Sequence, residues 1–104
     1  MNTYYVYILQ CSDKSYYVGI TNNLEKRILE HQEGIYIKSY TYTYKRRPIE
    51  LMFNTQFTDV DEAIKFEKQL KGWSRKKKKA IINGDWNLLP ELSKNNQNSS
   101  TSSE

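Results

Sequence analysis

The feature that most constrains the fold is a pair of tyrosine-rich segments on either side of a polar turn, YYVYILQCSDKSYYVGI at residues 4–20. Aromatic and β-branched residues dominate both segments and turn formers fill residues 11–15, so the pattern predicts a β-hairpin. Side chains alternate along a strand, which places Tyr7 on one face of the first strand and Tyr17 and Gly19 together on one face of the second. The hairpin can therefore bring two phenols together on one surface.

The rest of the chain predicts four further elements, first a helix, then a strand and two more helices: 24–33, 49–56, about 60–71 and 75–83. A glycine follows each predicted helix, as is common where helices end. Within the third strand, alternation is expected to place Ile49, Leu51 and Phe53 on one face. The order ββαβαα predicts an α+β domain in which a small, mostly antiparallel three-stranded sheet is flanked by helices.

The length of 104 residues suits one domain, expected over residues 1–84, followed by a C-terminal extension over 85–92. Residues 93–104 lack apolar side chains, which predicts a disordered tail. The single cysteine, Cys11, excludes an internal disulfide and a cysteine-based zinc site. No apolar run approaches a membrane span and no signal-peptide pattern opens the chain, so the expected compartment is the cytoplasm.

Positive charge is unevenly distributed. The chain carries 16 Lys and Arg against 12 Asp and Glu, a net charge of +4, and its basic residues gather in 34–58 and 71–79. A localised positive field suits a polyanion, most often nucleic acid. The alternative is a solvated surface that only confers solubility.

Aromatic residues interleave with the basic ones in the segment IYIKSYTYTYKRR, residues 35–47. Rings stack on bases and cations hold phosphates, which suits nucleic acid with little sequence preference. For Tyr40 and Tyr42 the alternative is an edge strand with half-buried rings. The residues expected to bind nucleic acid are Lys38, Tyr40, Lys45, Arg46, Arg47, Lys71, Arg75, Lys76, Lys77, Lys78 and Lys79.

Three polar side chains fall at inward positions of predicted helices. Glu67 lies in the middle of the second helix's apolar stripe, which is expected to consist of Val60, Ala63, Ile64 and Leu70. A carboxylate there is costly unless it is paired or binds a cation. The structural alternative is an ion pair, most naturally with Arg27. Arg27 and His31 form an i, i+4 pair beside the inward stripe of the first helix, and they either complete an amphipathic face or line a site.

These residues give the sequence a resemblance to the GIY-YIG endonuclease superfamily, and more closely to its small stand-alone bacterial members. The first motif stands as Tyr5-Val6-Tyr7, with Tyr in place of Gly, and the second as Tyr17-Val18-Gly19. Arg27, His31 and Glu67 follow in the family's order, and the resemblance covers roughly residues 3–84. The chain departs from many relatives at Ile20, where a lysine is frequent, and at 78–80, where an asparagine is frequent.

The resemblance implies hydrolysis of phosphodiester bonds in DNA or RNA with one divalent metal, Mg²⁺ or Mn²⁺. The catalytic residues that it implies are Tyr7, Tyr17, Arg27, His31 and Glu67. Glu67 would hold the metal, Arg27 would clamp the scissile phosphate, and either tyrosine, with help from His31, would accept a proton from water. A phenol of pKa ~10 needs nearby positive charge for that role. The choice of base among the two tyrosines and His31 stays open.

Two other functions are compatible with the sequence. One is a nucleic-acid-binding module with weak or lost cleavage, and a metal-dependent nicking assay separates it from the enzyme. The other is a basic protein-interaction domain for an acidic partner, which the salt dependence of DNA binding distinguishes.

Overall fold

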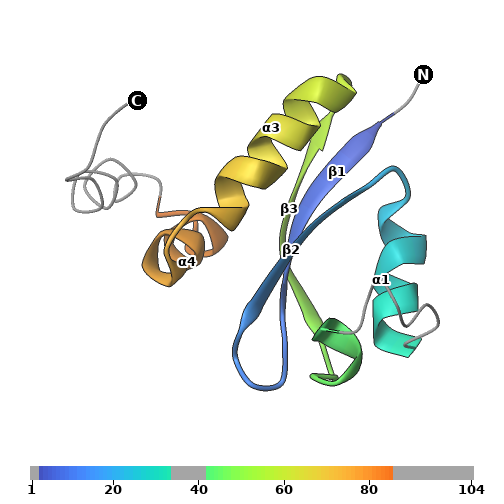
Figure 1. Cartoon of the computed structure of the whole chain (residues 1–104), viewed down its shortest axis with the longest axis vertical. Coiled ribbons are helices and arrows are strands. Elements are labelled where there is room, and N and C mark those ends of the chain that lie inside the picture. The colour runs from blue at the N-terminus through green and yellow to red at the C-terminus, as the bar shows by residue number, and fades with distance from the viewer. Residues whose placement is uncertain (1–2, 34–41, 86–104) are drawn as a thin grey trace. The chain divides into compact units, whose positions relative to one another are not determined.

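The structure is a computed structural model that describes residues 3–33 and 42–85. Its elements, in chain order, are β1 (Tyr4–Gln10), β2 (Tyr16–Thr21), α1 (Leu24–Glu33), β3 (Glu50–Phe57), α3 (Val60–Lys71) and α4 (Arg75–Asn83) (Figure 1). Residues 42–44 are also helical. The chain divides after Lys71 into two compact units, and the sheet, α1 and α3 belong to the first. The predicted α+β class and element order are confirmed.

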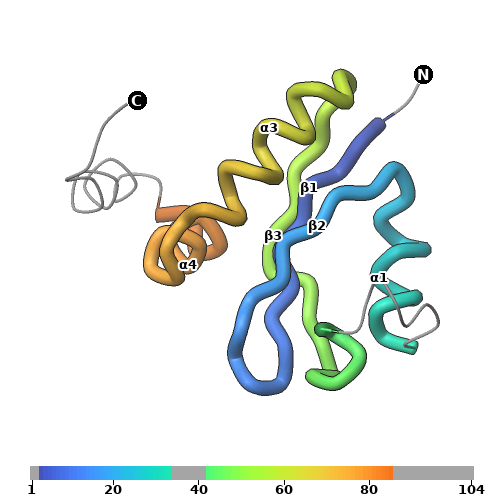
Figure 2. Tube along the Cα trace, in the orientation of Figure 1, coloured from blue at the N-terminus to red at the C-terminus, as the bar shows by residue number. Residues whose placement is uncertain are grey.

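The three strands form one antiparallel sheet in the order β2-β1-β3, so β1 is central. Figure 2 follows the trace through the hairpin that joins β1 to β2. Its loop spans residues 11–15 and is closed by the Cys11 amide, which donates to the Ser15 carbonyl at 2.9 Å. Lys14 adopts the left-handed region there, with φ at 72°. The predicted hairpin is confirmed.

The two faces of the sheet are covered by different helices, α1 and α3, which lie on opposite sides of it (Figure 1). Tyr7 pairs with Gly19 and Leu9 pairs with Tyr17, so these four side-chain positions share one face, as predicted. Leu24 and Ile28 of α1 pack against this face. The side chains that alternate with them, Val6, Ile8 and Val18, are buried on the face toward α3.

The prediction that Ile49, Leu51 and Phe53 share one face of the third strand is wrong. A bulge shifts the register of β3, because Ile8 pairs with Phe53 while the next residue, Leu9, pairs with Leu51. An inserted residue resets the alternation, so Leu51 and Phe53 do not share a face. Ile49 lies before the strand and is buried, in contact with the cluster around Tyr7.

The inward stripe of α3 is also different from the predicted one. Ala63 and Leu70 are buried as expected, but Val60 is 39% and Ile64 37% exposed. Phe66 takes an inward position instead, with its ring 5.5 Å from that of Phe57. The stripe therefore runs through positions 63, 66, 67 and 70, and Glu67 stays in it.

Side chains and a glycine cap the helix ends, and the glycine after the last helix is the predicted one. The Asn23 side chain accepts from the Lys26 amide at 3.1 Å at the start of α1, and Ser74 accepts from the Lys77 amide at 3.1 Å at the start of α4. Gly84 closes α4 with φ at 77°, a left-handed conformation that favours glycine. In the part of the chain described, no helix has both the length and the apolar character needed to cross a membrane.

Candidate active site

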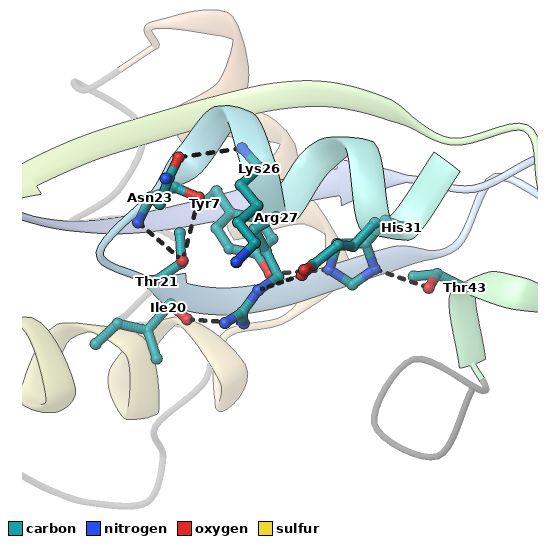
Figure 3. Close-up of polar contacts among 9 residues, drawn as sticks. Tyr7, Ile20, Thr21, Asn23, Lys26, Arg27, His31 and Thr43 are labelled. Carbon is teal, nitrogen blue, oxygen red and sulfur yellow. Dashed lines mark hydrogen bonds and ion pairs between the residues drawn. The ribbon is translucent and has the colours of Figure 1, made fainter. Parts of the chain in front are cut away.

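A buried chain of hydrogen bonds joins three elements beneath the hairpin (Figure 3). The Tyr7 hydroxyl lies 2.9 Å from His31 Nε2, and His31 Nδ1 lies 2.8 Å from Thr43 Oγ1. All three residues are fully buried, at 0% exposure. Burial, together with the nearby positive charge of Arg27, lowers the pKa of His31 from 6.5 to about 4. The imidazole is therefore neutral at pH 7, with one ring nitrogen donating and the other accepting.

The glycine of the second tyrosine motif is required by close packing. The Tyr7 phenol lies across Gly19, its partner in the β1–β2 register. A Cβ on Gly19 would overlap both the ring and the hydroxyl oxygen of Tyr7. The missing side chain at this position thus provides the space in which the phenol reaches His31.

Tyr17 is the second phenol on the same face. Its ring centroid lies 5.1 Å from that of His31, 6.4 Å from that of Tyr7 and 6.2 Å from that of Tyr42, which stacks with it. Tyr17 is partly exposed, whereas Tyr7 and His31 are enclosed. Burial raises the pKa of Tyr17 above its ordinary value, and the positive charges of Lys71 and Arg27 offset only part of this rise.

Arg27 reaches from α1 to the edge of β2. Its Nη1 donates to the Ile20 carbonyl at 3.4 Å, and its Nε lies 3.4 Å from Glu30 Oε1 (Figure 3). A polar cavity of about 160 Å³ lies beside the guanidinium, at the start of α1. Its lining residues are Thr21, Asn22, Asn23, Lys26, Arg27 and Glu30.

Glu67 is paired with a lysine on its own helix. Its Oε2 lies 2.8 Å from Lys71 Nζ, one turn further along α3. The carboxylate side chain is 12% exposed and the lysine 58%. The structural alternative of an ion pair with Arg27 is wrong in its partner, because the Glu67 carboxylate contacts Lys71. Arg27 lies beside Glu30. The Glu67–Lys71 pair could have been predicted from the sequence, because residues four apart on a helix are neighbours.

One carboxylate is enough for the metal that the sequence resemblance implies. Mg²⁺ keeps several waters and needs one or two protein carboxylates. Among residues 3–33 and 42–85, no group of three or more His, Cys, Asp or Glu side chains gathers to form a closed metal site. The inward, little-exposed carboxylate of Glu67 fits a cation that remains mostly hydrated.

The structure thus brings three of the expected residues into contact, while Arg27 and Glu67 act on one of them, Tyr17, through their charges. Tyr7, Tyr17 and His31 are in ring contact on the α1 side of the sheet. The charges of Arg27, Glu67 and Lys71 all act on the Tyr17 phenol. Thr43 and Glu30 could not be recognised from the sequence, since an isolated threonine and a helix glutamate carry no signal of their own.

The segment 42–47 differs from the strand considered for it. Tyr42 is helical, so the edge-strand alternative is wrong for this residue, while Lys38 and Tyr40 lie outside the described residues. The Arg46 guanidinium lies 3.8 Å from the Tyr42 ring centroid, and that of Arg47 lies 4.5 Å from the Tyr44 ring centroid. Both arginines thus stack on rings of their own segment.

Arg46 and Arg47 also bind protein oxygens. Arg46 Nε donates to Asp13 Oδ2 at 3.0 Å and its Nη1 donates to the Tyr42 carbonyl at 3.0 Å. Arg47 donates from Nε to the Tyr44 carbonyl at 3.1 Å and from Nη1 to the Gln32 carbonyl at 3.3 Å. Their first role is to hold the segment in place, and a role in nucleic-acid binding stays a prediction.

The basic residues of the second unit differ in accessibility. Arg75, Lys76 and Lys79 are exposed. Lys77 lies over the Trp73 ring, with Nζ 4.3 Å from the centroid, and burial lowers the pKa of Lys77 and Lys78. The basic stretch of α4 therefore exposes fewer of its charges than its sequence suggests.

The described part of the chain is a small α+β domain. Its antiparallel sheet carries two motif tyrosines on one face, α1 supplies an arginine and a histidine, and α3 supplies a carboxylate. Residues 3–80 match the family model for the GIY-YIG catalytic domain. The chain belongs to the GIY-YIG family.

Relatives of the same small size support this assignment. A UPF0213 protein of Bacillus pumilus is 42% identical over 81 residues, which cover 78% of this chain and 80% of the relative. The UPF0213 protein YazA of Bacillus subtilis is 41% identical over 81 residues, covering 78% of this chain and 79% of the relative. The solution NMR structure of a UPF0213 protein from Bacillus halodurans matches at a TM-score of 0.51 and 37% identity, covering 78% of this chain and 83% of that one.

Proposed function

We propose that this domain is a metal-dependent endonuclease that hydrolyses phosphodiester bonds in DNA, with RNA and branched or single-stranded DNA as substrates of the same chemistry. The observation that carries the proposal is the position of Tyr17. It is a partly exposed phenol in ring contact with His31 and within the fields of Arg27, Lys71 and Glu67. Membership of the GIY-YIG family supports the same reaction class.

The burial of the candidate bases favours Tyr17 as the group that accepts the proton from water. Tyr7 and His31 are fully enclosed, so neither can contact a water at the surface in this conformation. Tyr17 is partly open to solvent. Burial raises its pKa despite the positive charges of Lys71 and Arg27, so the phenol needs the further positive charge of a metal at Glu67 to ionise. The Tyr7–His31–Thr43 chain then holds the rings against which Tyr17 packs.

Arg27 is the group proposed to bind the scissile phosphate. Its side chain is about a third exposed, and a planar guanidinium offers several donors to phosphate oxygens. Glu67 is proposed to hold Mg²⁺ or Mn²⁺. Once bound, the metal would stabilise the developing negative charge on the phosphate and the leaving oxygen.

The second candidate function is a nucleic-acid-binding module without efficient cleavage. The Glu67–Lys71 pair favours it, because a carboxylate whose charge is already compensated binds a cation less strongly. Exposed cations at Lys45, Lys76 and Lys79 would serve binding alone equally well.

The test is a Mg²⁺-dependent nicking assay on supercoiled DNA, run together with DNA binding and a thermal melt. Glu67→Gln is expected to lower cleavage at least about 100-fold while binding persists, because the amide has no charge for a hard cation. Glu62→Gln is the matched control, since Glu62 is exposed on the same helix.

The stability of the Glu67→Gln variant shows whether a loss of cleavage comes from unfolding. Glu67→Gln breaks an ion pair whose lysine is mostly exposed, so the free energy of unfolding should change by less than about 1 kcal/mol. A variant that cleaves at the wild-type rate would contradict the metal role. DNA binding by a wild-type protein that does not nick DNA would favour the second candidate.

A further inference from the structure

We propose that Lys71 is the resident cation of the Glu67 carboxylate and competes with a divalent metal for it. This inference rests on the proposed metal role of Glu67. The lysine ammonium occupies one carboxylate oxygen at 2.8 Å. Glu67 must therefore give up this contact, or share it, when it accepts a metal.

The unequal burial of Glu67 and Lys71 explains how Lys71 can leave the carboxylate and let another cation bind. The Glu67 side chain is 12% exposed, and a carboxylate so little exposed needs a compensating charge. Lys71 is 58% exposed at the last residue of α3, so its flexible chain can move into water at small cost. The pair thus keeps the carboxylate compensated and still lets it be released.

The neighbouring cations are unsuited to this role. The Arg27 guanidinium is bound by the Ile20 carbonyl and by Glu30. Lys68 follows Glu67 on α3 and is exposed, and within the described ranges no ion pair joins it to a carboxylate. Lys71 is consequently the cation that contacts Glu67, and Lys68 provides a control of equal charge on the same helix.

Lys71 also links the carboxylate to the second phenol. Its positive charge acts on Tyr17, as does the negative charge of Glu67. An ammonium released from Glu67 is free to approach a phosphate oxygen. The sequence-based expectation that Lys71 contacts nucleic acid would then apply to the state in which Glu67 has released it.

The experiment measures Mn²⁺ binding directly, by the electron paramagnetic resonance signal of free Mn²⁺, in low salt and without nucleic acid. The variants are Lys71→Met, Lys68→Met, Lys71→Arg and Glu67→Gln beside the wild type. Lys71→Met is expected to bind Mn²⁺ roughly two- to five-fold more tightly than the wild type, the range for loss of an exposed ion pair. Lys71→Arg should stay near the wild type, because it keeps a competing cation.

The comparison with Lys68→Met decides the result. Both substitutions remove one positive charge from α3, so a larger gain for Lys71→Met supports competition at Glu67. If both variants gain equally in Mn²⁺ affinity, the effect comes from net charge alone and the proposed competition is refuted. The metal role of Glu67 would still be tested by Glu67→Gln. A weaker affinity in Lys71→Met would also overturn the competition. Failure of both wild type and Lys71→Met to bind Mn²⁺ would refute the metal role of Glu67 and the competition together.

Discussion

Both ring nitrogens of His31 lie within hydrogen-bonding distance of hydroxyl groups, and the side chain has no solvent exposure. Tyr7 contacts Nε2 and Thr43 contacts Nδ1, and the residue is 0% exposed. Protonation would place a charge in this position and require both nitrogens to donate. Desolvation therefore favours the neutral ring and lowers its pKa to about 4.

The lowered pKa of His31 predicts acid-sensitive stability. The unfolded chain binds a proton at pKa 6.5 and the folded one at about 4, so stability is complete above pH 6.5 and falls as the pH decreases through this window. Between about pH 7.5 and 5, the wild type should lose about 2 kcal/mol of unfolding free energy relative to His31→Gln. Urea unfolding at both pH values measures this difference.

A direct measurement of the imidazole gives the control. The chain has one histidine, so its ring-proton NMR signals are unambiguous. A midpoint near 6.5 in the folded protein would contradict the buried, neutral His31, even if the Gln variant failed to fold.

At the scale of single residues, the sequence predicted the phenols and polar side chains but only part of their partners. Strand alternation placed Tyr7 and Tyr17 on one face because β1 and β2 are regular. Thr43 could not be predicted as the partner of His31, since its place depends on how the segment 42–47 folds back. Glu30, which pairs with Arg27, is indistinguishable in sequence from a solvent-facing helix glutamate.

Among the elements, the segment 42–47 positions much of the site. The Arg46 carbonyl accepts from the Ser12 amide at 2.8 Å, and the Arg46 amide donates to the Thr43 carbonyl at 3.0 Å. With the Asp13 ion pair, these contacts fasten the segment to the hairpin loop. Thr43 is thereby held against His31.

Arg46 is expected to anchor the segment 42–47 rather than to offer its charge to a partner. Arg46→Gln should lower the free energy of unfolding by about 1–2 kcal/mol, because it removes hydrogen bonds, an ion pair and a ring contact. Lys45→Gln removes the same charge from an exposed neighbour and should change stability by less than about 0.5 kcal/mol. Urea unfolding of both variants checks this, and equal effects would show that Arg46 does not anchor the segment.

The boundaries of the helices and strands were predictable from the sequence, but the inward faces of β3 and α3 were not. The β3 bulge at the Leu51–Phe53 register leaves no trace in an apolar pattern of period two. In α3, the apolar positions fit two overlapping stripes, and the packing of Phe66 on Phe57 decides between them. The predictions failed where tertiary contacts choose among local patterns of similar quality.

For the molecule as a whole, the sequence overstates the positive charge available to a partner. Ten basic residues in 34–47 and 71–79 were expected to face nucleic acid. Arg46, Arg47 and Lys71 are bound to protein oxygens, and Lys77 lies over Trp73. Of the remaining described members, Lys45, Arg75, Lys76 and Lys79 are exposed.

Four exposed cations predict a moderate salt dependence of DNA binding. If each neutralises one duplex phosphate, log K should fall with log salt at a slope of about −3.6. Replacing both Lys76 and Lys79 with Gln removes two such contacts, so the slope should become about −1.8. Fluorescence anisotropy with a short duplex at several salt concentrations measures both values.

The control variant carries Lys65→Gln and Lys68→Gln, which remove the same charge from exposed positions of α3 outside the predicted interface. Its slope should stay near that of the wild type, because only contacting cations release counterions from DNA. Equal changes in the two double variants would mean that DNA responds to net charge and not to the α4 surface. A slope near zero in the wild type would rule out the phosphate backbone as the main contact, and the exposed lysines would then have to serve a partner recognised by other means.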